Sequence, residues 1–368
     1  TTTFSFHRAN MFLKYSSKLQ VVRIIDTAAK NATSTTRSDA EGPTSGSLGE
    51  VVKNETDFNS QLSGLNTDKH TFIAKYPGAL GNSLQVQLCL PGKYGDSAYN
   101  NWAFKGEFDA APRTSDFATK RAATNDEVHA LVIDKKGLFT GTADTVLERF
   151  AFASVGSNAK DNAGSNIFIK DVINETSQYV WMINGDSSMI STLTDDADAA
   201  HTQAAFGTTI DSGDNFARNS GTTMIGAGVA PISFDFDSGV DVSSLSDGQI
   251  LAGYDLFEDK DQVEIDFLLA PGSATRSSMT AIVNDLVTTA SSLRKDCVVV
   301  ASPARDDVVN VNAAATATTN IVATADTYTK SSYLVMDGNF LKVYDKFNDQ
   351  FIEIPASSST AGIMAATD

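Results

Sequence analysis

Acidic side chains are the residues whose spacing first suggests chemistry in this chain. Asp235, Asp237 and Asp241, with a glycine between the last two, faintly resemble a calcium-binding loop, in which carboxylates supply oxygen ligands. The glutamate that such a loop carries at its twelfth position is missing. Because Asp235 and Asp237 alternate with Phe234 and Phe236, the spacing is typical of a half-buried strand. We therefore predict a strand here, with a bound cation as the weaker alternative.

A second acidic cluster occupies residues 255–266. Its members are Asp255, Glu258, Asp259, Asp261, Glu264 and Asp266. One interpretation is a solvated helix end followed by the polar face of a strand. The other is a patch that meets a basic neighbour, since stripes of one charge set partner choice and register.

Residues that commonly bind metals or act as nucleophiles share no useful spacing. The histidines and cysteines are far apart: His7, His70, His129, His201, Cys89 and Cys297. No HExxH, CxxC, serine-elbow or phosphate-loop motif occurs, so we expect buried thiols, no metal and no cofactor. Paired carboxylates for glycoside hydrolysis need only meet in space, but only Trp102 and Trp181 could form a sugar platform.

The composition and net charge limit the classes of partner that the protein can have. The 368 residues allow about two or three globular domains, and 42% of them are hydrophobic. A formal net charge of -17 and a pI near 4.6 argue against nucleic acid or an anionic membrane as the main partner, since both select for basic patches. No apolar run has the length that a bilayer span requires.

The last hundred residues predict an α/β frame. Apolar runs at 263–269 and 297–301 flank a helical periodicity at 279–293, which together predict a βαβ unit with parallel strands. Ligands in such folds bind beyond the carboxyl ends of the strands, here the loops 270–276 and 302–307. Neither loop has a phosphate-binding glycine pattern.

Further elements surround this unit. We predict a polar loop after residue 307, then a hairpin of strands 333–336 and 340–344 around an Asp-Gly-Asn turn, and a strand at 351–354. Residues 243–259 read as a helix capped by Ser246 or Asp247. Near the start, residues 4–19 predict a helix and 21–25 a buried strand of the same sheet.

The middle of the chain has a different pattern. Residues 31–49 are polar and predict a flexible linker, and 195–228 predict an exposed excursion. Between and beyond them, short β-type runs separated by turns predict a β-rich insert. These seven runs are 71–74, 84–90, 128–133, 150–153, 167–169, 179–183 and 232–236.

Ordered motifs at both ends of the chain resemble the contractile tail sheath protein of myovirus-type bacteriophages. The matching segments are ANMFLKYSSKLQVVRIID (9–26), AKYPGALGNSLQVQL (74–88), AGYDLFEDKDQVEIDFLLAPGSA (252–274), RKDCVVVASPARDDVV (294–309) and MDGNFLKVYDKFND (336–349). Each is short, but all stand in the order typical of the family.

The resemblance implies a multidomain α/β and α+β protein. Residues 1–26 and 241–368 would form part of a discontinuous α/β core domain, and 27–240 an inserted, β-sandwich-like outer domain. The segment 31–49 would stand in place of an additional outer domain. The family's weaving terminal arms would be missing, so we expect a middle fragment that is monomeric when isolated.

The resemblance further implies a structural virion protein and no enzyme. Its partners would be copies of itself in hexameric rings or a helical lattice, the tail tube protein, and baseplate and tail terminator proteins. Candidate intersubunit contacts are Asp255, Glu258, Asp259, Asp261, Arg276 and Arg305. The two arginines could equally form local salt bridges.

Two alternatives remain open from the residues. One is a carbohydrate-active or phosphate-handling enzyme on an α/β scaffold, with its ligand beyond the strand ends. The other is a receptor-binding surface module, which exposed aromatic residues such as Tyr94, Tyr99 and Trp102 would favour.

Overall fold

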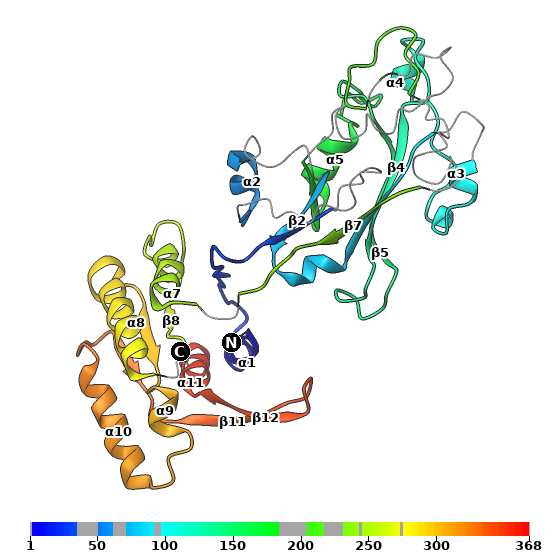
Figure 1. Ribbon diagram of the computed structural model, residues 1–368. Coiled ribbons are helices and arrows are strands. Elements are labelled where there is room, and N and C mark those ends of the chain that lie inside the picture. The colour runs from blue at the N-terminus through cyan, green and yellow to red at the C-terminus, as the bar shows by residue number, and fades with distance from the viewer. Residues whose placement is uncertain are drawn as a thin grey trace. The chain divides into compact units, whose positions relative to one another are not determined.

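Two compact units make up the chain. The computed structural model describes residues 2–34, 51–61, 71–91, 97–183, 204, 206–216, 231–242, 245–272 and 275–367 (Figure 1). Unit 1 consists of Thr1–Asp26 and Ser243–Asp368, and unit 2 is Thr27–Val242. Within the described residues, no helix has both the length and the apolar character needed to cross a bilayer.

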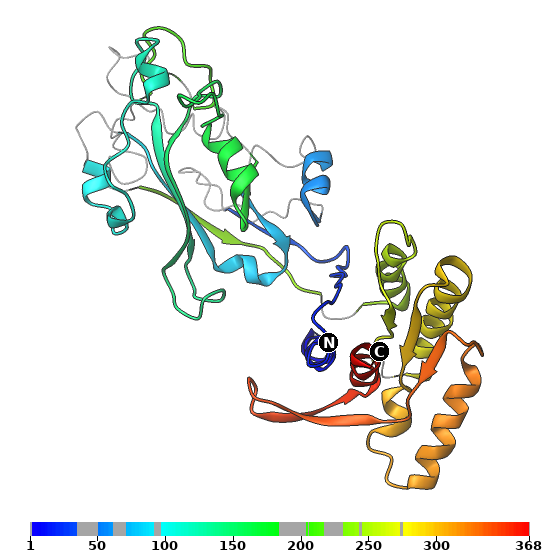
Figure 2. The same cartoon turned by 180° about the vertical axis from the view of Figure 1, so that it is seen from behind.

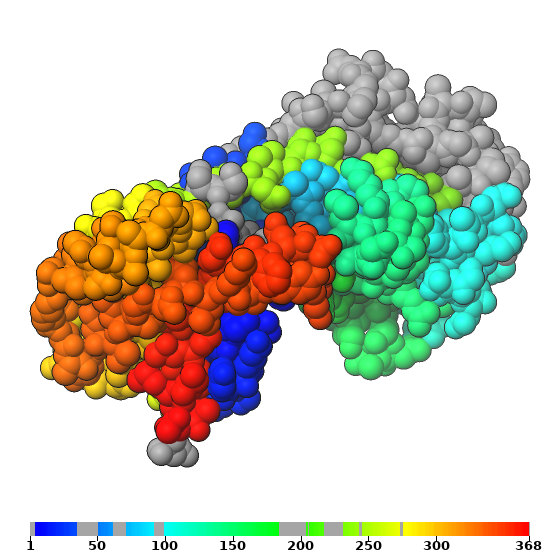
Figure 3. Space-filling view, turned by 90° about the horizontal axis from the view of Figure 1, so that it is seen from below, coloured from blue at the N-terminus to red at the C-terminus, as the bar shows by residue number. Residues whose placement is uncertain are grey.

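Unit 1 is built on a three-stranded sheet and a separate hairpin. Its strands are β8 (Phe267–Leu269), β9 (Val298–Ala301), β10 (Leu334–Met336), β11 (Phe340–Asp345) and β12 (Gln350–Pro355). Its helices are α1 (Thr2–Phe12), α7 (Asp247–Tyr254), η4 (Asp255–Phe257), α8 (Arg276–Thr288), the π-helix η5 (Thr289–Arg294), α9 (Arg305–Val308), α10 (Ala314–Thr327) and α11 (Ser357–Ala366). Helices α1 and α11 lie side by side (Figure 3).

The predicted βαβ unit is confirmed. Strand β8 pairs in parallel with β9, and α8 connects them. Met279, Ile282, Val283 and Leu286 are fully buried in the cluster that also holds residues of β8 and β9. The predicted capping of α7 is also confirmed, because Ser246 and Gln249 form a capping box there.

The predicted hairpin around the Asp-Gly-Asn turn is wrong. Strand β10 pairs in parallel with β9, with Leu334 opposite Val299 and Met336 opposite Ala301. It can do so because α10 provides a second crossover where a polar loop was predicted. That helix is rich in alanine and threonine, and among its residues only Thr324 is buried, so it lacks the large apolar stripe that periodicity detects. The hairpin forms instead between β11 and β12.

The predicted strand at 21–25 is also wrong. This segment has no ladder partner, and Val21 is 74% exposed. Its neighbour Ile24 packs against α7, where a Cβ added to Gly253 would lie 2.7 Å from Ile24 Cγ1. The apolar residues here therefore cover a helix instead of joining the sheet, and the preceding helix ends at Phe12.

Unit 2 contains one antiparallel sheet in the order β5-β4-β3-β7-β1-β2-β6. Its strands are β1 (Asn31–Ser34), β2 (Phe72–Pro77), β3 (Leu84–Cys89), β4 (Glu127–Asp134), β5 (Thr145–Ser154), β6 (Val180–Met182) and β7 (Ile232–Asp237). Its helices are α2 (Glu55–Gln61), η1 (Ala79–Ser83), α3 (Ser97–Asn100), η2 (Lys105–Glu107), α4 (Asp116–Thr119) and α5 (Ile169–Thr176), and α5 packs on β5 and β6 (Figure 2). The described strands thus form a single sheet and not the two facing sheets of a sandwich.

Six of the seven predicted strands are confirmed, and the seventh is replaced. Residues 167–169 lead into α5, and the missing strand is β1, which lies in the segment predicted as a linker. The side chain of Asn31 in this strand bonds to backbone groups of two other segments. Asn31 Nδ2 donates to Val52 O (2.9 Å) and Ala74 O (3.0 Å), and Asn31 Oδ1 accepts from Val52 N (3.0 Å). The rest of the predicted linker lies outside the described residues.

The predicted excursion at 195–228 is corrected where the structure describes it. Phe206, Ile210 and Phe216 are each about 1% exposed and belong to the main core of unit 2. The segment is polar and glycine-rich overall, but three large apolar residues suffice to anchor it. Its remaining residues, apart from those at 204 and 206–216, lie outside the described part of the chain.

Candidate functional site

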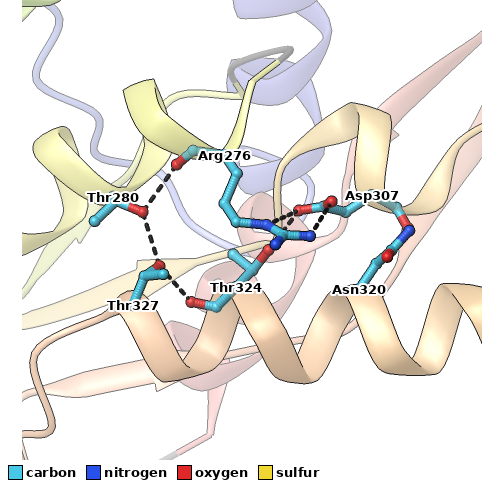
Figure 4. Close-up of polar contacts among 6 residues, drawn as sticks. All are labelled: Arg276, Thr280, Asp307, Asn320, Thr324 and Thr327. Atoms are coloured by element: carbon cyan, nitrogen blue, oxygen red, sulfur yellow. Dashed lines mark hydrogen bonds and ion pairs between the residues drawn. The ribbon is translucent and has the colours of Figure 1, made fainter.

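The loops that follow β8 and β9 meet at an ion pair (Figure 4). Arg276, the first residue of α8, donates from Nε to Asp307 Oδ2 (3.0 Å) and from Nη2 to Asp307 Oδ1 (2.6 Å). Thr275 caps the helix by accepting from Ser278 N, which fixes the direction in which α8 begins. The paired geometry of the guanidinium and carboxylate makes this a strong, directional contact.

Threonines and an asparagine extend this contact to α10. Thr324 Oγ1 donates to Asp307 Oδ2, and Asn320 Nδ2 donates to Asp307 O (3.3 Å). The hydroxyls of Thr280 on α8 and Thr327 on α10 lie 2.7 Å apart. We call Arg276, Thr280, Asp307, Asn320, Thr324 and Thr327 the helix clamp, because it joins α8, α9 and α10.

The electrostatics of the clamp favour the charged pair. Burial alone would raise the pKa of Asp307, but the hydrogen bonds from Arg276 and Thr324 outweigh it and hold that pKa below its usual value. The Arg276 guanidinium has a raised pKa because of its hydrogen bond to Asp307. The pair is therefore ionised at neutral pH, and the hydrogen bonds of the clamp hold α8, α9 and α10 together.

A second polar group lies where β9 and β10 end. Ser302 Oγ donates to the Asp337 carboxylate (2.9 and 3.1 Å) and accepts from Ser357 N (3.1 Å). Tyr328 Oη donates to Ser302 O (3.1 Å). Burial raises the pKa of Tyr328, and it also raises that of Asp337 despite the hydrogen bonds from Ser302 and Asn339. These groups bond to one another and tie the sheet to α11.

The two arginines predicted as intersubunit contacts both have partners within the chain. Arg276 belongs to the clamp, and Arg305 Nη2 lies 3.3 Å from Glu353 Oε2 on β12, with both side chains 35% exposed. The structure does not bring either arginine to the acidic cluster.

The acidic cluster is on the surface. Asp255, Asp259 and Asp261 are exposed and Glu258 is half-buried. Asp259 Oδ1 accepts from Asp261 N (2.9 Å), which shapes the loop between η4 and β8. This supports the interpretation of a solvated loop and leaves its carboxylates available to a neighbour.

Sequence reasoning missed the residue that holds this loop. The side chain of Arg294 is fully buried and donates to Phe257 O (2.6 Å) and Val263 O (2.8 Å). It also pairs with Asp296 at 3.0 Å. An arginine at the end of an otherwise apolar helix face was the available signal, because such a cation requires buried acceptors.

The other candidates fit structural roles. Asp235 is exposed and Phe234 and Phe236 are buried, so the predicted strand alternation at β7 is confirmed. Within the described ranges, no group of three or more histidine, cysteine, aspartate or glutamate side chains could hold a metal ion. Cys89 and Cys297 are buried free thiols, as predicted. His70 and His201 lie outside the described residues.

Comparison with known proteins bears out the resemblance to tail sheath proteins. The chain matches no protein-family model. It is 25% identical to the tail sheath protein of Salmonella phage ViI over 96% of this chain and 59% of that protein. It is 24% identical to the tail sheath protein of Enterobacteria phage T4, over 80% of this chain and 40% of that protein.

The chain therefore spans about two to three fifths of the length of these curated relatives. A solved structure, the sheath tail protein Lin1278 from Listeria innocua, aligns with 99% of this chain and 48% of its own chain. That alignment has 11% sequence identity and a TM-score of 0.44.

Proposed function

We propose that this chain is a structural subunit of a contractile phage tail sheath, without a catalytic role. The observation that carries the proposal is the similarity to the ViI tail sheath protein, which extends over 96% of the chain and hence over both units. The chain would be part of the virion, and would be made in the host bacterial cytoplasm.

In this proposal, copies of the protein stack in rings around a tail tube and move between two lattice packings. Contraction would then be a shift of near-rigid subunits from a metastable arrangement to one of lower free energy, which drives the tube through the host envelope. The helix clamp supports the required stiffness, since it joins three helices of unit 1. Tube, baseplate and tail terminator proteins would be the other partners.

Unit 1 would provide the core of the sheath, and unit 2 its outward-facing domain. The acidic cluster of unit 1 is the surface that we propose for contact between copies. Asp255, Asp259 and Asp261 are exposed, whereas Arg276 and Arg305 already bond within the chain. Basic groups elsewhere on the neighbouring copy would therefore meet the cluster, and such rim charges set specificity and register.

Of the aromatic residues that would favour the receptor-binding alternative, the two that the structure describes are not fully exposed. Trp102 is 2% exposed and Tyr99 is half-buried, while Tyr94 lies outside the described residues. The enzyme alternative asked for a ligand beyond the ends of β8 and β9. There the polar groups of the clamp and of Ser302 bond to one another, which supports a structural role for these loops.

Immunogold electron microscopy of the source particles tests the proposal. An antibody against this chain should label a contractile tail regularly along its whole length, in both extended and contracted particles. Serum taken before immunisation is the control. Label confined to the tail tip or to fibres, or absent from the particles, would overturn the sheath assignment and return the strand-end loops to the list of candidate sites.

A further inference from the structure

His129 lies inside unit 2, on the face of the seven-stranded sheet that points away from the main core. Along β4, Val128, Ala130 and Val132 face the main core, and the intervening residues face the opposite side. That side is covered by residues 97–111, which we call the cap segment. Trp102 and Phe108 of the cap segment pack with Cys89, Leu131 and Ile133 of the sheet.

Both nitrogens of the His129 ring bond to backbone groups. Nδ1 lies 3.0 Å from Phe152 N, and since an amide can only donate, Nδ1 must be the unprotonated acceptor. Nε2 lies 2.8 Å from Ala110 O, and since a carbonyl can only accept, Nε2 must carry the hydrogen. The neutral imidazole thus connects β5 to the end of the cap segment.

The backbone at Phe152 depends on this bond. Its φ of 52° lies in the left-handed region, which is unfavourable for a bulky residue. Here β5 bulges, because the pairing of β4 and β5 shifts register between Val128 and Ala130. The Nδ1 acceptor stabilises the bulge by giving the Phe152 amide a partner inside the protein.

The surroundings of the ring are apolar. Phe108 stacks on it at 4.2 Å and 5°, and Phe152 meets it edge-on at 4.6 Å. The titratable groups facing it are the Tyr99 phenol, whose ring centroid is 6.2 Å away, and the thiol of Cys89, its register partner on β3.

Among the charged residues in or beside the cap segment, Lys105 and Glu107 lie on η2, the exposed Asp109 follows η2, and Arg149 lies on β5. Arg149 Nη1 donates to Glu107 O (3.3 Å), and neither side chain bonds to the ring. Burial lowers the pKa of His129, which agrees with the neutral form that the two hydrogen bonds require.

We propose that His129 is an acid-sensitive latch: protonation of Nδ1 sets two N–H donors against each other and releases the cap segment from the sheet. A released histidine titrates near pH 6.5. Because release takes up one proton, each unit of pH below that value should shift the docked-to-released equilibrium up to about tenfold toward release. The cluster around Trp181 contains no residue of the cap segment, so we expect the opening to be local.

The two tryptophans allow a direct test. Trp102 lies in the cap segment, where Nε1 donates to Gln87 Oε1 (2.6 Å), whereas Trp181 stacks on Phe58 in a separate cluster. The variant Trp181→Phe leaves Trp102 as the only reporter, and Trp102→Phe leaves Trp181. Emission wavelength and iodide quenching are recorded from pH 7.5 to 4.5 in the full chain.

We expect iodide quenching of Trp102 to rise progressively as the pH is lowered from about 6.5 to 4.5, while Trp181 stays protected. In the background Trp181→Phe, the further change His129→Gln should remove this pH dependence. Protection of Trp102 down to pH 4.5, exposure of both tryptophans together, or an unchanged transition in His129→Gln would each overturn the proposal.

A second measurement covers the case in which His129→Gln does not fold. Amide hydrogen exchange of the unmodified chain, corrected for intrinsic pH dependence, should rise at low pH in peptides from 97–111 and around Phe152. Peptides from β7 should keep their protection. Equal loss of protection in β7 would mean global acid unfolding and would overturn the latch.

Discussion

The two units place their buried polar groups differently. In unit 1 many of them lie at or near the ends of strands and helices, as with Ser302, Asp307 and Ser357. In unit 2 several of them also lie within the strands themselves, as with Asn31 and Ser34 of β1. Polar groups at element ends leave the apolar pattern of the elements intact, whereas polar groups inside a strand erase it. The following predictions test whether both placements are equally important.

The largest effect should come from Asn31→Ala in unit 2. This change leaves Val52 N, Val52 O and Ala74 O without their side-chain partner, and we expect it to lower the free energy of unfolding by about 3 kcal/mol. Tryptophan fluorescence in urea measures it, because both tryptophans lie in unit 2. Thr33→Val is the matched control in the same strand, since the Thr33 hydroxyl is buried without a partner and its loss should cost nothing. Equal losses in the two variants would contradict the comparison.

In unit 1, Asp307→Ala should lower the free energy of unfolding by about 2 kcal/mol, because it removes the acceptor of Arg276 and Thr324. The urea dependence of labelling at the buried Cys297 thiol reports on this unit. Because the pKa of Asp307 is lowered in the folded state, its contribution is present above the unfolded pKa of about 3.9 and is lost as the pH falls below it. The exposed neighbour Asp306 provides the control, since Asp306→Ala should change little.

Two glycines of α7 separate packing from helix propensity. Gly253→Ala should destabilise unit 1 by roughly 1 to 2 kcal/mol, because its Cβ would meet Ile24 at 2.7 Å. Gly248→Ala meets nothing within 4 Å and should stabilise by about 0.5 kcal/mol through propensity alone. Stabilisation by both changes would show that residues 21–25 do not pack firmly on α7. Cys297 labelling measures both.

At neutral pH, Tyr328→Phe should lower the free energy of unfolding by about 1 kcal/mol, because one hydrogen bond to Ser302 O is lost. The pKa of Tyr328 is raised in the folded state, so the stability of unit 1 should fall as the pH rises above the unfolded value of about 10. The variant should lose that alkaline dependence. If the stability of Tyr328→Phe still fell with the same slope above pH 10, another titrating group would be responsible for the alkaline dependence.

The sequence predicted the elements whose burial is apolar and periodic. Helix α8 could be located because Met279 and Ile282 follow the 3.6-residue period of a helix, and β8 and β9 because they lie in short apolar runs. Strand β1 was missed because Asn31 and Ser34 are typical of loops. Helix α10 was missed because alanine and threonine give no apolar stripe.

The sequence located the loops of the candidate site but not the partners of their side chains. The loops 270–276 and 302–307 do carry polar residues at the strand ends. The ion-pair partners of Arg276 and Arg305 are Asp307 and Glu353 of the same chain. Such pairs are set by tertiary distance, which no local spacing reveals. The acceptors of Arg294, the backbone carbonyls of Phe257 and Val263, are likewise set by tertiary distance, although its place at the end of an apolar helix face indicated a buried cation.

The discontinuity of unit 1 has a consequence during synthesis. Helix α1 emerges from the ribosome well before its partners Ile354 and Ala361, which are encoded more than three hundred residues later. At bacterial elongation rates of about 20 residues per second, Met11 and Phe12 would wait on the order of 15 seconds for their apolar contacts. Unit 2 is translated within that interval and can fold before unit 1 closes. The nascent chain must therefore keep the apolar residues Met11 and Phe12 of one short helix from misassociating until β12 and α11 arrive.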